Sequence, residues 1–534
     1  MSIPEFEQIV EPNDQTEARL VHLKAIAELV GNPYPNKFER SRLTGEKDTI
    51  SQIVSFEPVT SLLPELAEGE RPDPDLKASV NEKLKALGSV RVAGRLATPP
   101  RTMGKAAFVH LSDGRNRLQI YVRKQDAKAI NNDDGTVLEE GNTGFSLFKL
   151  LDHGDFVGVE GFLFITNTGE LSIHVEKIQF LTKAMVPMPD KMHGIEDPEI
   201  KQRQRYADLI GSSLQVEHEG LTTREVFERR AKVVSFLRRY LEDDGYIEVE
   251  TPMLTPKATG AAAKPFATHH NALDITLYAR IAPELYLKRL TVGGFEKVYE
   301  LNRNFRNEGI SYKHNPEFTM LEFYCAYMDV DGMMDLCEDM MRKSVKDATG
   351  GLQVEYEGKM IDFSKFERIS MRDAIAQHVT DADITDENLV TLFDEYVEPN
   401  LVQPTFIIDF PKSISPLSKA SPENSAIAER FELFIHGMEC ANGFSELNDP
   451  REQYERFVDQ MAERERGDEE AMILDEDYIR ALSYGMPPAA GIGIGVDRFV
   501  MLLTDRHSIR DVILFPHLRP ERHPEEADSA DATE

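Results

Sequence analysis

One polar hairpin carries the most informative combination of side chains in the chain. Its two strands are predicted over 295–305 and 317–327, joined by a polar loop that contains a glycine and a proline. Because alternate residues of a strand point to the same side, Phe318, Glu322 and Tyr324 share one face. An aromatic ring, a carboxylate and a phenol make a poor core, but they suit a site for a planar base, phosphates and a cation.

The loop of this hairpin adds charged groups that suit phosphate chemistry. Arg306 and Glu308 lie at its start, and His314 lies near its end. An arginine can neutralise charge that develops on a phosphoryl group, and a carboxylate can accept a hydrogen bond from an exocyclic amine. Each of these groups alone could be part of a surface ion pair. Their combination with Phe318 and with Arg498 favours a nucleotide site.

A second candidate segment, 491–498, is a strand that feeds a helix. Glycines at 491, 493 and 495 leave one strand face without side chains, so a ligand could approach the backbone there. Arg498 lies where the helix begins and could reach a phosphate. The spacing is G-x-G-x-G, not the G-x-G-x-x-G of dinucleotide-binding loops, and no βαβ pattern surrounds it. Tight strand packing is the structural alternative for these glycines.

Two further acidic residues, Glu432 and Glu439, suit Mg²⁺ beside a triphosphate, because this cation prefers a few carboxylates together with phosphate oxygens and water. The two residues have opposite strand parity. A bend or bulge near Gly437 is therefore required to bring them together. Further along, Asn442 and Glu446 share strand parity, which places an amide and a carboxylate on one face.

The segment that begins near residue 89 has the pattern of a small β-barrel. Five short strands, with a helix over 145–150 before the fourth, predict a Greek-key barrel of the OB type. The predicted strands are 90–96, 107–112, 117–122, 155–165 and 171–181. Arg101, Phe108 and Gln119 lie in its first part, and OB folds use such groups to stack and read single-stranded bases. The alternative is that Phe108 belongs to the core.

The remainder of the chain reads as one large α+β unit that opens with an amphipathic helix. Its apolar residues recur at spacings of three and four: Phe227, Ala231, Val234, Leu237 and Leu241. We expect the following organisation: a helical arm and acidic insertion over 1–87, the OB barrel over 88–183, a linker over 184–220, the α+β domain over 221–520 and an acidic disordered tail over 521–534.

Composition points to a soluble protein of the cytoplasm. The chain has 534 residues, enough for two to four domains, with 41% hydrophobic and 29% charged residues. There is no apolar run long enough for a bilayer, and the N-terminus is acidic where a signal peptide would be basic and apolar. Three cysteines make neither a disulfide framework nor a zinc pattern.

The net charge of −32 opposes the approach of nucleic acid at long range. Any contact with RNA must therefore use local basic patches. Candidate patches occur at 91–105, 201–205 and 224–239.

Several long segments together resemble the class II lysyl-tRNA synthetases of the bacterial type, from about residue 88 to residue 520. The three class II motifs are recognisable at 229–252, 305–324 and 491–498. Strings similar to those of the same family lie at 268–274, 280–289, 442–448 and 508–516.

The resemblance implies a lysine–tRNA ligase that uses L-lysine, ATP, Mg²⁺ and tRNA(Lys), works as a cytoplasmic homodimer and has no membrane segment. It implies that Phe318 stacks on adenine and that Glu308 accepts from the adenine amino group. Arg306 would hold the α-phosphate and the lysine carboxylate, while His314 and Arg498 would bind the outer phosphates. The two arginines are the expected catalytic groups.

The same resemblance assigns the other sites. Gly260 and Glu284 would take the α-amino group of lysine, Asn442 its carboxylate, and Glu446, Tyr324 and Glu322 its ε-ammonium. Mg²⁺ would bind to Glu432 and Glu439, and the anticodon to Arg101, Phe108 and Gln119. The first motif would form a two-fold dimer interface, which the Leu237 and Leu241 stripe fits.

Three alternatives share parts of this pattern. An aspartyl- or asparaginyl-tRNA synthetase would need cationic or amide groups in place of Glu446 and Glu284. A catalytically silent RNA-binding paralogue would have lost Arg306, Glu432 or Arg498, and all three are present. The truncated paralogue that lysylates an elongation factor lacks a barrel.

Overall fold

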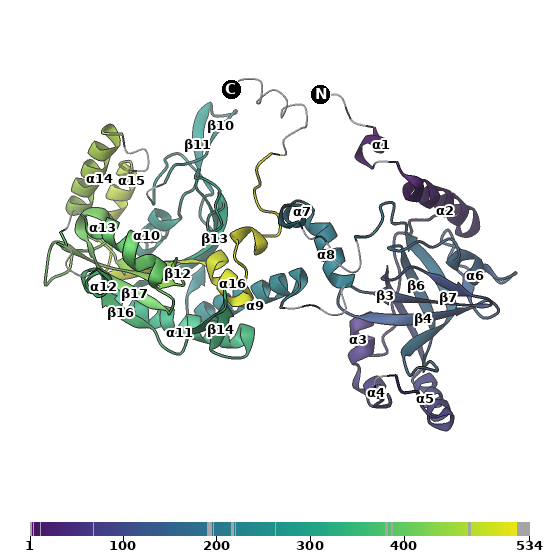
Figure 1. The fold of residues 1–534 in the computed structure, drawn as a ribbon. Helices are drawn as coiled ribbons and strands as arrows, with labels where there is room; N and C mark the ends of the chain where they lie inside the picture. Colours follow the sequence, from purple (N-terminus) through teal and green to yellow (C-terminus); the bar gives the residue numbers. More distant parts are fainter. Residues whose placement is uncertain are drawn as a thin grey trace, which may run out of the picture. The chain divides into compact units, whose positions relative to one another are not determined.

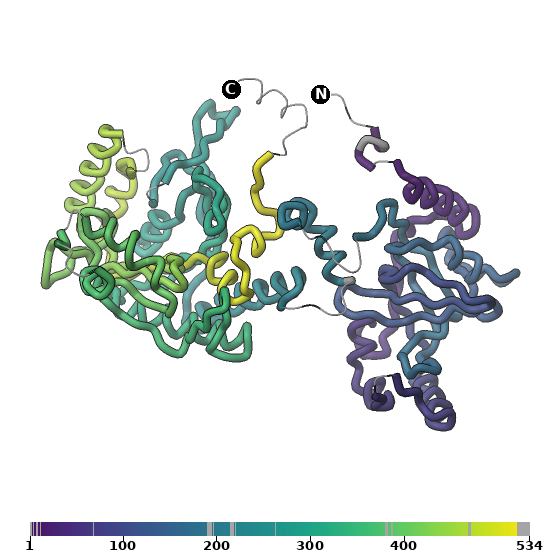
Figure 2. Tube along the Cα trace, in the orientation of Figure 1, coloured from purple at the N-terminus to yellow at the C-terminus, as the bar shows by residue number. Residues whose placement is uncertain are grey.

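The structure is a computed structural model that describes residues 3–520, apart from residues 4, 11, 68, 190–194, 196, 215–217, 219, 262, 380–382, 386–387 and 468–470. The predicted acidic tail over 521–534 lies outside the described residues. The chain divides into two compact units, Met1–Thr222 and Thr223–Glu534, and each is described by itself. Figures 1 and 2 show the path of the chain through both units.

Helices open the first unit, and polar side chains cap the starts of several of them. They are α1 (Phe6–Ile9), α2 (Asp14–Val30), α3 (Ile50–Ser55), α4 (Glu57–Thr60) and α5 (Pro74–Ala86). Asn13 caps α2 in a reciprocal pair with Thr16, and Asp73 caps α5 ahead of a proline at the first helical position. Helix α5 packs against the barrel, so this part of the predicted insertion is folded.

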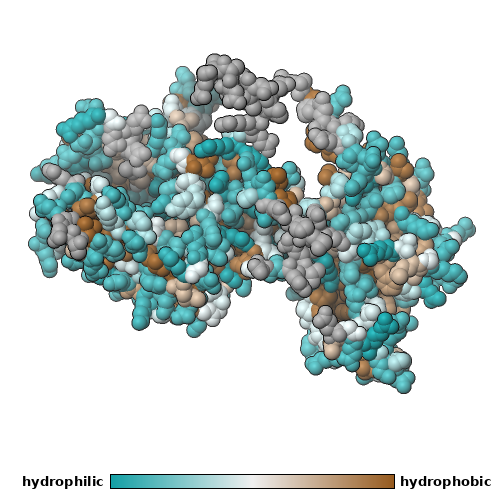
Figure 3. Space-filling model, viewed as in Figure 1, coloured by the Kyte–Doolittle hydropathy of each residue, from teal (hydrophilic) through white to brown (hydrophobic). Residues whose placement is uncertain are grey.

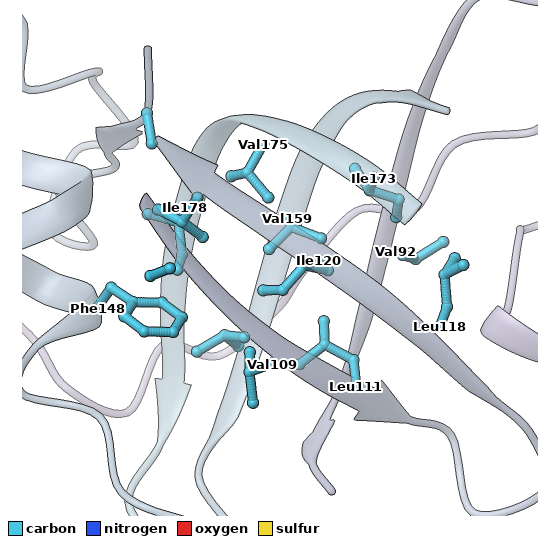
Figure 4. Close-up of a cluster of buried hydrophobic side chains, with 14 of the residues drawn as sticks. Val92, Val109, Leu111, Leu118, Ile120, Phe148, Val159, Ile173, Val175 and Ile178 are labelled. Atoms are coloured by element: carbon cyan, nitrogen blue, oxygen red, sulfur yellow. The ribbon is translucent and has the colours of Figure 1, made fainter. Parts of the chain in front are cut away.

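The predicted OB-type barrel is confirmed. Its main strands are β1 (Ser89–Leu96), β3 (Ala106–Ser112), β4 (Arg117–Arg123), β6 (Phe156–Ile165) and β7 (Leu171–Thr182), with short strands β2 (Arg101–Met103) and β5 (Lys128–Ala129). The order β1-β6-β7-β4-β3 closes because β3 also pairs with β1. Alternate residues of each strand fill the interior, as Figure 4 shows, and α6 (Thr143–Phe148) precedes the fourth main strand as expected.

The segment predicted as a linker contains two helices, α7 (Pro198–Arg203) and α8 (Arg205–Leu214). Asp197 caps α7 by accepting from the backbone of Glu199 and Ile200. The basic residues Lys201, Arg203 and Arg205 therefore lie on helices.

A large mixed sheet forms the centre of the second unit. Among its described residues, eight strands follow the order β16-β17-β18-β19-β20-β13-β12-β8, antiparallel except for the pairs at each end. Their bounds are β8 (Ile247–Glu248), β12 (Lys297–Phe305), β13 (Glu317–Ala326), β16 (Glu367–Ser370), β17 (Thr405–Pro411), β18 (Ile427–Ile435), β19 (Met438–Ser445) and β20 (Ala489–Gly495). The predicted α+β class with an antiparallel sheet is confirmed.

Helices and small strands surround this sheet (Figure 1). The helices are α9 (Thr223–Asp243), α10 (Glu284–Val292), α11 (Val330–Thr349), α12 (Met371–His378), α13 (Leu389–Leu392), α14 (Pro450–Glu465), α15 (Glu476–Leu482) and α16 (Val496–Thr504). The small strands are β9 (Leu254–Thr255), β10 (Ala267–His270), β11 (Ile275–Ala279), β14 (Gln353–Tyr356) and β15 (Lys359–Asp362), and the helical turns are η1 (Phe393–Val397), η2 (Glu398–Asn400), η3 (Lys412–Ile414) and η4 (Ile509–Asp511).

The face that α9 buries differs from the predicted stripe. Val226, Val233, Leu237 and Leu241 are the buried residues, whereas Ala231 is exposed. Helix α9 packs on α11 and α16 within the same chain. The expectation that the Leu237 and Leu241 stripe forms a dimer interface is therefore wrong, because these side chains are already part of the chain's own core.

Figure 3 shows a face on which hydrophilic residues predominate and hydrophobic ones are scattered. Among the residues described, none of the helices combines the length and the apolar character that crossing a membrane requires.

Candidate active site

The predicted polar hairpin is confirmed as β12 and β13, which pair from Lys297 with Cys325 to Phe305 with Glu317. Strand β13 lies between β12 and β20, so both of its edges are hydrogen-bonded. Its even-numbered residues line two neighbouring cavities above the sheet. The rigid centre of the sheet therefore positions the side chains that were singled out on this strand.

The first cavity brings together every residue that was predicted to bind the nucleotide. Its walls include Arg306, Glu308, His314, Phe318 and Arg498. The two arginines, which come from segments far apart in the sequence, open onto the same space. Lys313 and Asp497 also line this cavity and were not predicted.

Both arginines of this cavity are held by defined contacts. The guanidinium of Arg306 lies 5.1 Å from the ring centre of Phe318, an arrangement typical of a cation–π contact. Arg498 donates from Nη1 to the backbone oxygen of Glu439 at 2.7 Å. The neighbouring Asp497 accepts from the backbone nitrogen of Thr319 at 2.6 Å, which ties the start of α16 to β13.

The surroundings of His314 disfavour its charged form. Burial lowers the pKa of His314, and the positive charges of Arg498, Lys313 and Arg306 lower it further. Its Nδ1 lies 2.8 Å from the hydroxyl of Ser311, which orients the ring. An anion in the cavity would reverse the electrostatic part of this shift.

The second cavity, of about 300 Å³, contains most of the residues that were predicted to bind the amino acid. Its lining includes Gly260, Glu284, Glu322, Tyr324 and Asn442. The volume lies at the lower end of the range for small-molecule sites, which suits a ligand as small as an amino acid. Arg306, Met320, Glu439 and Gly493 line both cavities, so the two spaces adjoin.

Glu322 is a buried carboxyl group with little to stabilise its charge. Burial raises the pKa of Glu322 to about 8, and the negative charge of Glu284 adds to the shift. Asn304 donates to Glu322 at 3.4 Å, and Arg306 acts in the opposite direction, but neither compensates for the burial. A cation beside Glu322 would lower this pKa and be bound strongly.

Glu446 does not line the second cavity. Its side chain is fully buried, and one carboxylate oxygen lies 2.5 Å from the ammonium nitrogen of Lys288. Lys288 also contacts Glu284 at 2.6 Å. Sequence reasoning missed Lys288, although Glu284 and Lys288 are four residues apart, a spacing that brings side chains together on a helix.

The glycines of β20 serve both purposes that the sequence suggested, close packing and access for a ligand. A Cβ atom at Gly491 would collide with the ring of Tyr324 and the carboxylate of Glu446, so this glycine permits close packing. Gly493 and Gly495 line the first cavity, and Gly491 and Gly493 line the second, so the absence of side chains also leaves room for a ligand. A Cβ atom at Gly493 would in addition meet the flexible end of Met320.

Glu432 and Glu439 face the same side of the sheet, as the prediction required. The β18–β19 hairpin turns at His436 and Gly437, both with positive φ, and its register shifts so that Cys440 is an extra residue. Burial raises the pKa of Glu432 to about 7. The guanidinium of Arg430 opposes this shift, with its Nη2 atom 2.5 Å from Oε1 of Glu432.

The donor set at these two carboxylates fits Mg²⁺ only if a ligand supplies further oxygens. In the described part of the chain, no group of three or more His, Cys, Asp or Glu side chains could hold a metal ion. Both carboxylates line the second cavity, and Glu439 also lines the first. Two carboxylates completed by phosphate oxygens and water are a common arrangement for this cation.

The predicted anticodon residues lie on the outer face of the barrel. Arg101 pairs with Phe108 across β2 and β3, and the Phe108 ring lies 4.8 Å from that of Tyr121. Gln119 donates to Glu170 at 2.8 Å. Phe108 is half-buried on the outer face, so the alternative that it belongs to the core is wrong.

Comparison with known proteins agrees with this geometry. Residues 197–519 match the protein family described as tRNA synthetases class II (D, K and N), and residues 90–181 match the OB-fold nucleic acid binding domain. The chain is 47% identical to the lysine–tRNA ligase of Coxiella burnetii, with 96% of this chain and 99% of the relative covered. It is 45% identical to that of Aeromonas hydrophila (97% and 99% covered) and 50% identical to that of Dichelobacter nodosus (82% and 89% covered).

Proposed function

The chain belongs to the family of class II tRNA synthetases (D, K and N), and we propose how its residues carry out the reaction of a lysine–tRNA ligase. Its activity is that of this ATP-dependent ligase. L-lysine and ATP give lysyl-adenylate and pyrophosphate, and the 3′-terminal hydroxyl of tRNA(Lys) then takes the lysyl group with release of AMP.

The position of Arg306 is the observation that carries the assignment of roles. This side chain lines both the nucleotide cavity and the amino acid cavity. In the first step the lysine carboxylate attacks the α-phosphorus, and both reacting groups are negative. A guanidinium between them neutralises their repulsion and holds them in line, so that positioning and charge provide the catalysis without a side-chain nucleophile.

The nucleotide roles follow from the walls of the first cavity. Phe318 stacks on adenine, and Glu308 accepts from its amino group. His314 and Arg498 bind the outer phosphates, and Arg498 acts with Arg306 as a catalytic group because it faces the charge that pyrophosphate carries away.

The lysine roles follow from the second cavity. The backbone at Gly260 and the carboxylate of Glu284 bind the α-ammonium, and Asn442 helps to bind the carboxylate. Glu322 and Tyr324 bind the ε-ammonium from the cavity wall, and the carboxylate of Glu446, which lies against Gly491 of that wall, adds its negative charge. A buried carboxylate is costly unless a cation pairs with it, so an amino acid with a neutral side chain is rejected.

Mg²⁺ is the proposed metal, held by Glu432 and Glu439. When bound, it would neutralise phosphate charge and orient the triphosphate. Arg430 already pairs with Glu432, so the metal must share that carboxylate or displace the guanidinium.

The parts of the chain have separate proposed tasks. Residues 88–183 bind the anticodon of tRNA(Lys) through Arg101, Phe108 and Gln119, and residues 221–520 carry out catalysis. The proposed domain organisation also includes an N-terminal arm at 1–87, a linker at 184–220 and a tail at 521–534.

We place the enzyme in the cytoplasm and propose that it is a homodimer. The three cysteines are free and buried, as suits a reducing compartment. The interface would use the apolar side chains that remain exposed near the first motif: Ile247, Met253 and Leu254.

The test of substrate choice is ATP–pyrophosphate exchange with each amino acid in turn. Lysine is expected to drive exchange, and aspartate and asparagine are not. Exchange driven best by aspartate or asparagine would favour the related synthetases. If none of the amino acids drives exchange, a catalytically silent RNA-binding paralogue is favoured.

A further inference from the structure

The ammonium of Lys288 is enclosed between two of the carboxylates that we assign to the amino acid. Its side chain is fully buried, with Nζ 2.6 Å from Glu284 and 2.5 Å from Glu446. The ring centre of Phe444 lies 5.1 Å away. The established reaction gives this internal cation no task.

Acidic and phenolic groups face Lys288 and its partners from several elements. Helix α10 supplies Glu284, the segment after β19 supplies Glu446, β13 supplies Glu322 and Tyr324, and α15 supplies Tyr478. Burial lowers the pKa of Lys288, but Glu284 and Glu446 raise it by more, so the ammonium stays charged. Two further cations act on this group, Arg306 through Glu322 and Arg289 through Tyr478.

The charges of this cluster match one kind of ligand. In the lysine-bound state, with Glu284, Glu322 and Glu446 all ionised, the three carboxylates and the single ammonium of Lys288 leave two negative charges. Free lysine has two ammonium groups, and its own carboxylate faces Arg306. The filled pocket is therefore balanced only if Lys288 supplies the third positive charge.

We infer that Lys288 is a positioning residue that determines which amino acid neutralises the pocket. Because Lys288 supplies one positive charge, the amino acid must carry two ammonium groups. This inference rests on the proposed function and deepens it, because it names a determinant of substrate choice. Without Lys288, a carboxylate would remain buried without a cation and would take up a proton. A protonated Glu446 no longer attracts the ε-ammonium.

The contacts of Glu446 explain how Lys288 could also orient this acid. One carboxylate oxygen binds Lys288, and the other faces Gly491 and the Tyr324 ring, on the side of the amino acid cavity. Each oxygen thus has its own cation, one internal and one from the substrate. The contact of Lys288 with Glu284 fixes the second acid in the same way.

The test is Lys288→Met, which removes the charge and keeps the length of the side chain. In lysine-dependent ATP–pyrophosphate exchange at pH 7, we expect the KM for lysine to rise at least about thirtyfold, with the KM for ATP changed less than about twofold. Raising the pH should restore kcat/KM for lysine by a larger factor in the variant than in the wild type, because Glu446 must lose its proton. Lys343→Met, which removes an ion pair of the same helical spacing on α11, is the matched control and should change neither constant.

A double variant separates the charge effect from packing and carries the test if Lys288→Met does not fold. In Lys288→Met/Glu446→Gln, position 446 no longer carries an unpaired carboxylate, and of the two acids bound to Lys288 only Glu284 loses its partner. We expect its KM for lysine to lie within about threefold of that of Glu446→Gln alone. Losses that simply add would overturn the inference.

Failure of the inference is distinguishable from failure of the proposed function. If lysine does not drive exchange in the wild type, the proposed function is wrong. If lysine drives exchange in the wild type and Lys288→Met keeps its KM for lysine within about twofold, or loses equally at every pH, only the role of Lys288 is wrong.

Discussion

Glu439 faces the same side of the central sheet as Glu432 because Cys440 is an extra residue in the ladder between β18 and β19. Regular pairing would turn one of the two carboxylates away from the cavity. The bulge therefore makes the proposed Mg²⁺ site possible.

Substitution at these carboxylates should change the need for the metal. We expect Glu439→Gln to raise the Mg²⁺ concentration for half-maximal exchange about tenfold or more, because a charged ligand is lost. Glu429→Gln, on the same strand as Glu432, is the control and should leave the Mg²⁺ dependence unchanged. An unaltered Mg²⁺ titration for Glu439→Gln would remove this residue from the proposed site.

The proposed lysine pocket predicts a selective loss for Glu446→Gln. The KM for lysine should rise about thirtyfold or more, and the KM for ATP should change little, because Glu446 lies against Gly491, which lines the amino acid cavity but not the nucleotide cavity. Both constants can be measured in the same exchange assay. Equal losses for the two substrates would contradict the assigned role.

The raised pKa of Glu322 predicts that lysine binding releases a proton. In the free enzyme this carboxyl holds its proton below about pH 8, and a bound ammonium favours the ionised form, so its pKa falls. Lysine affinity should therefore weaken by up to about tenfold for each pH unit below 8.

Calorimetry measures this proton directly. Lysine titrations at pH 7.5 in two buffers of different ionisation enthalpy should give different apparent binding enthalpies, and Glu322→Gln should reduce that difference. Identical enthalpies in both buffers for the wild type would mean that Glu322 does not change its ionisation.

The outer face of the barrel predicts a separation of the two reaction steps. Phe108→Ala should reduce kcat/KM for tRNA about tenfold, since stacking of one base on an aromatic ring contributes about 1–3 kcal/mol. Adenylate formation should be unaffected and serves as the internal control. If the rates of adenylate formation and of tRNA charging fall together, the barrel does not act through the anticodon alone.

The exposed residues near the first motif predict the site of dimerisation. A charge at this surface, as in Ile247→Glu, should convert a homodimer into monomers, as measured by light scattering after size exclusion. Tyr454→Glu places the same charge on an equally exposed apolar residue of α14 and should leave the dimer intact. A wild-type chain that is already monomeric would rule out the proposed homodimer.

Patterns confined to single segments were predictable. The barrel strands, the β12–β13 hairpin and the shared face of Phe318, Glu322 and Tyr324 depend on a period of two and on local turn residues. The need for a bulge between Glu432 and Glu439 also followed from parity. The buried face of α9 was predicted incorrectly, because apolar residues cover more than one face of this helix and packing on α11 and α16 selects one.

By itself, the sequence determined the fold class, the family and the identity of the polar residues at the site, since these follow from local periodicity and from motifs of contiguous residues. Only the tertiary structure decided that Glu446 lies against Gly491 and pairs with Lys288, and that Arg306 lines two cavities. The physical reason is that an ion pair depends on the distance between side chains from remote segments. That distance is set by how α10, β19 and β20 pack together, and no spacing within one segment encodes it.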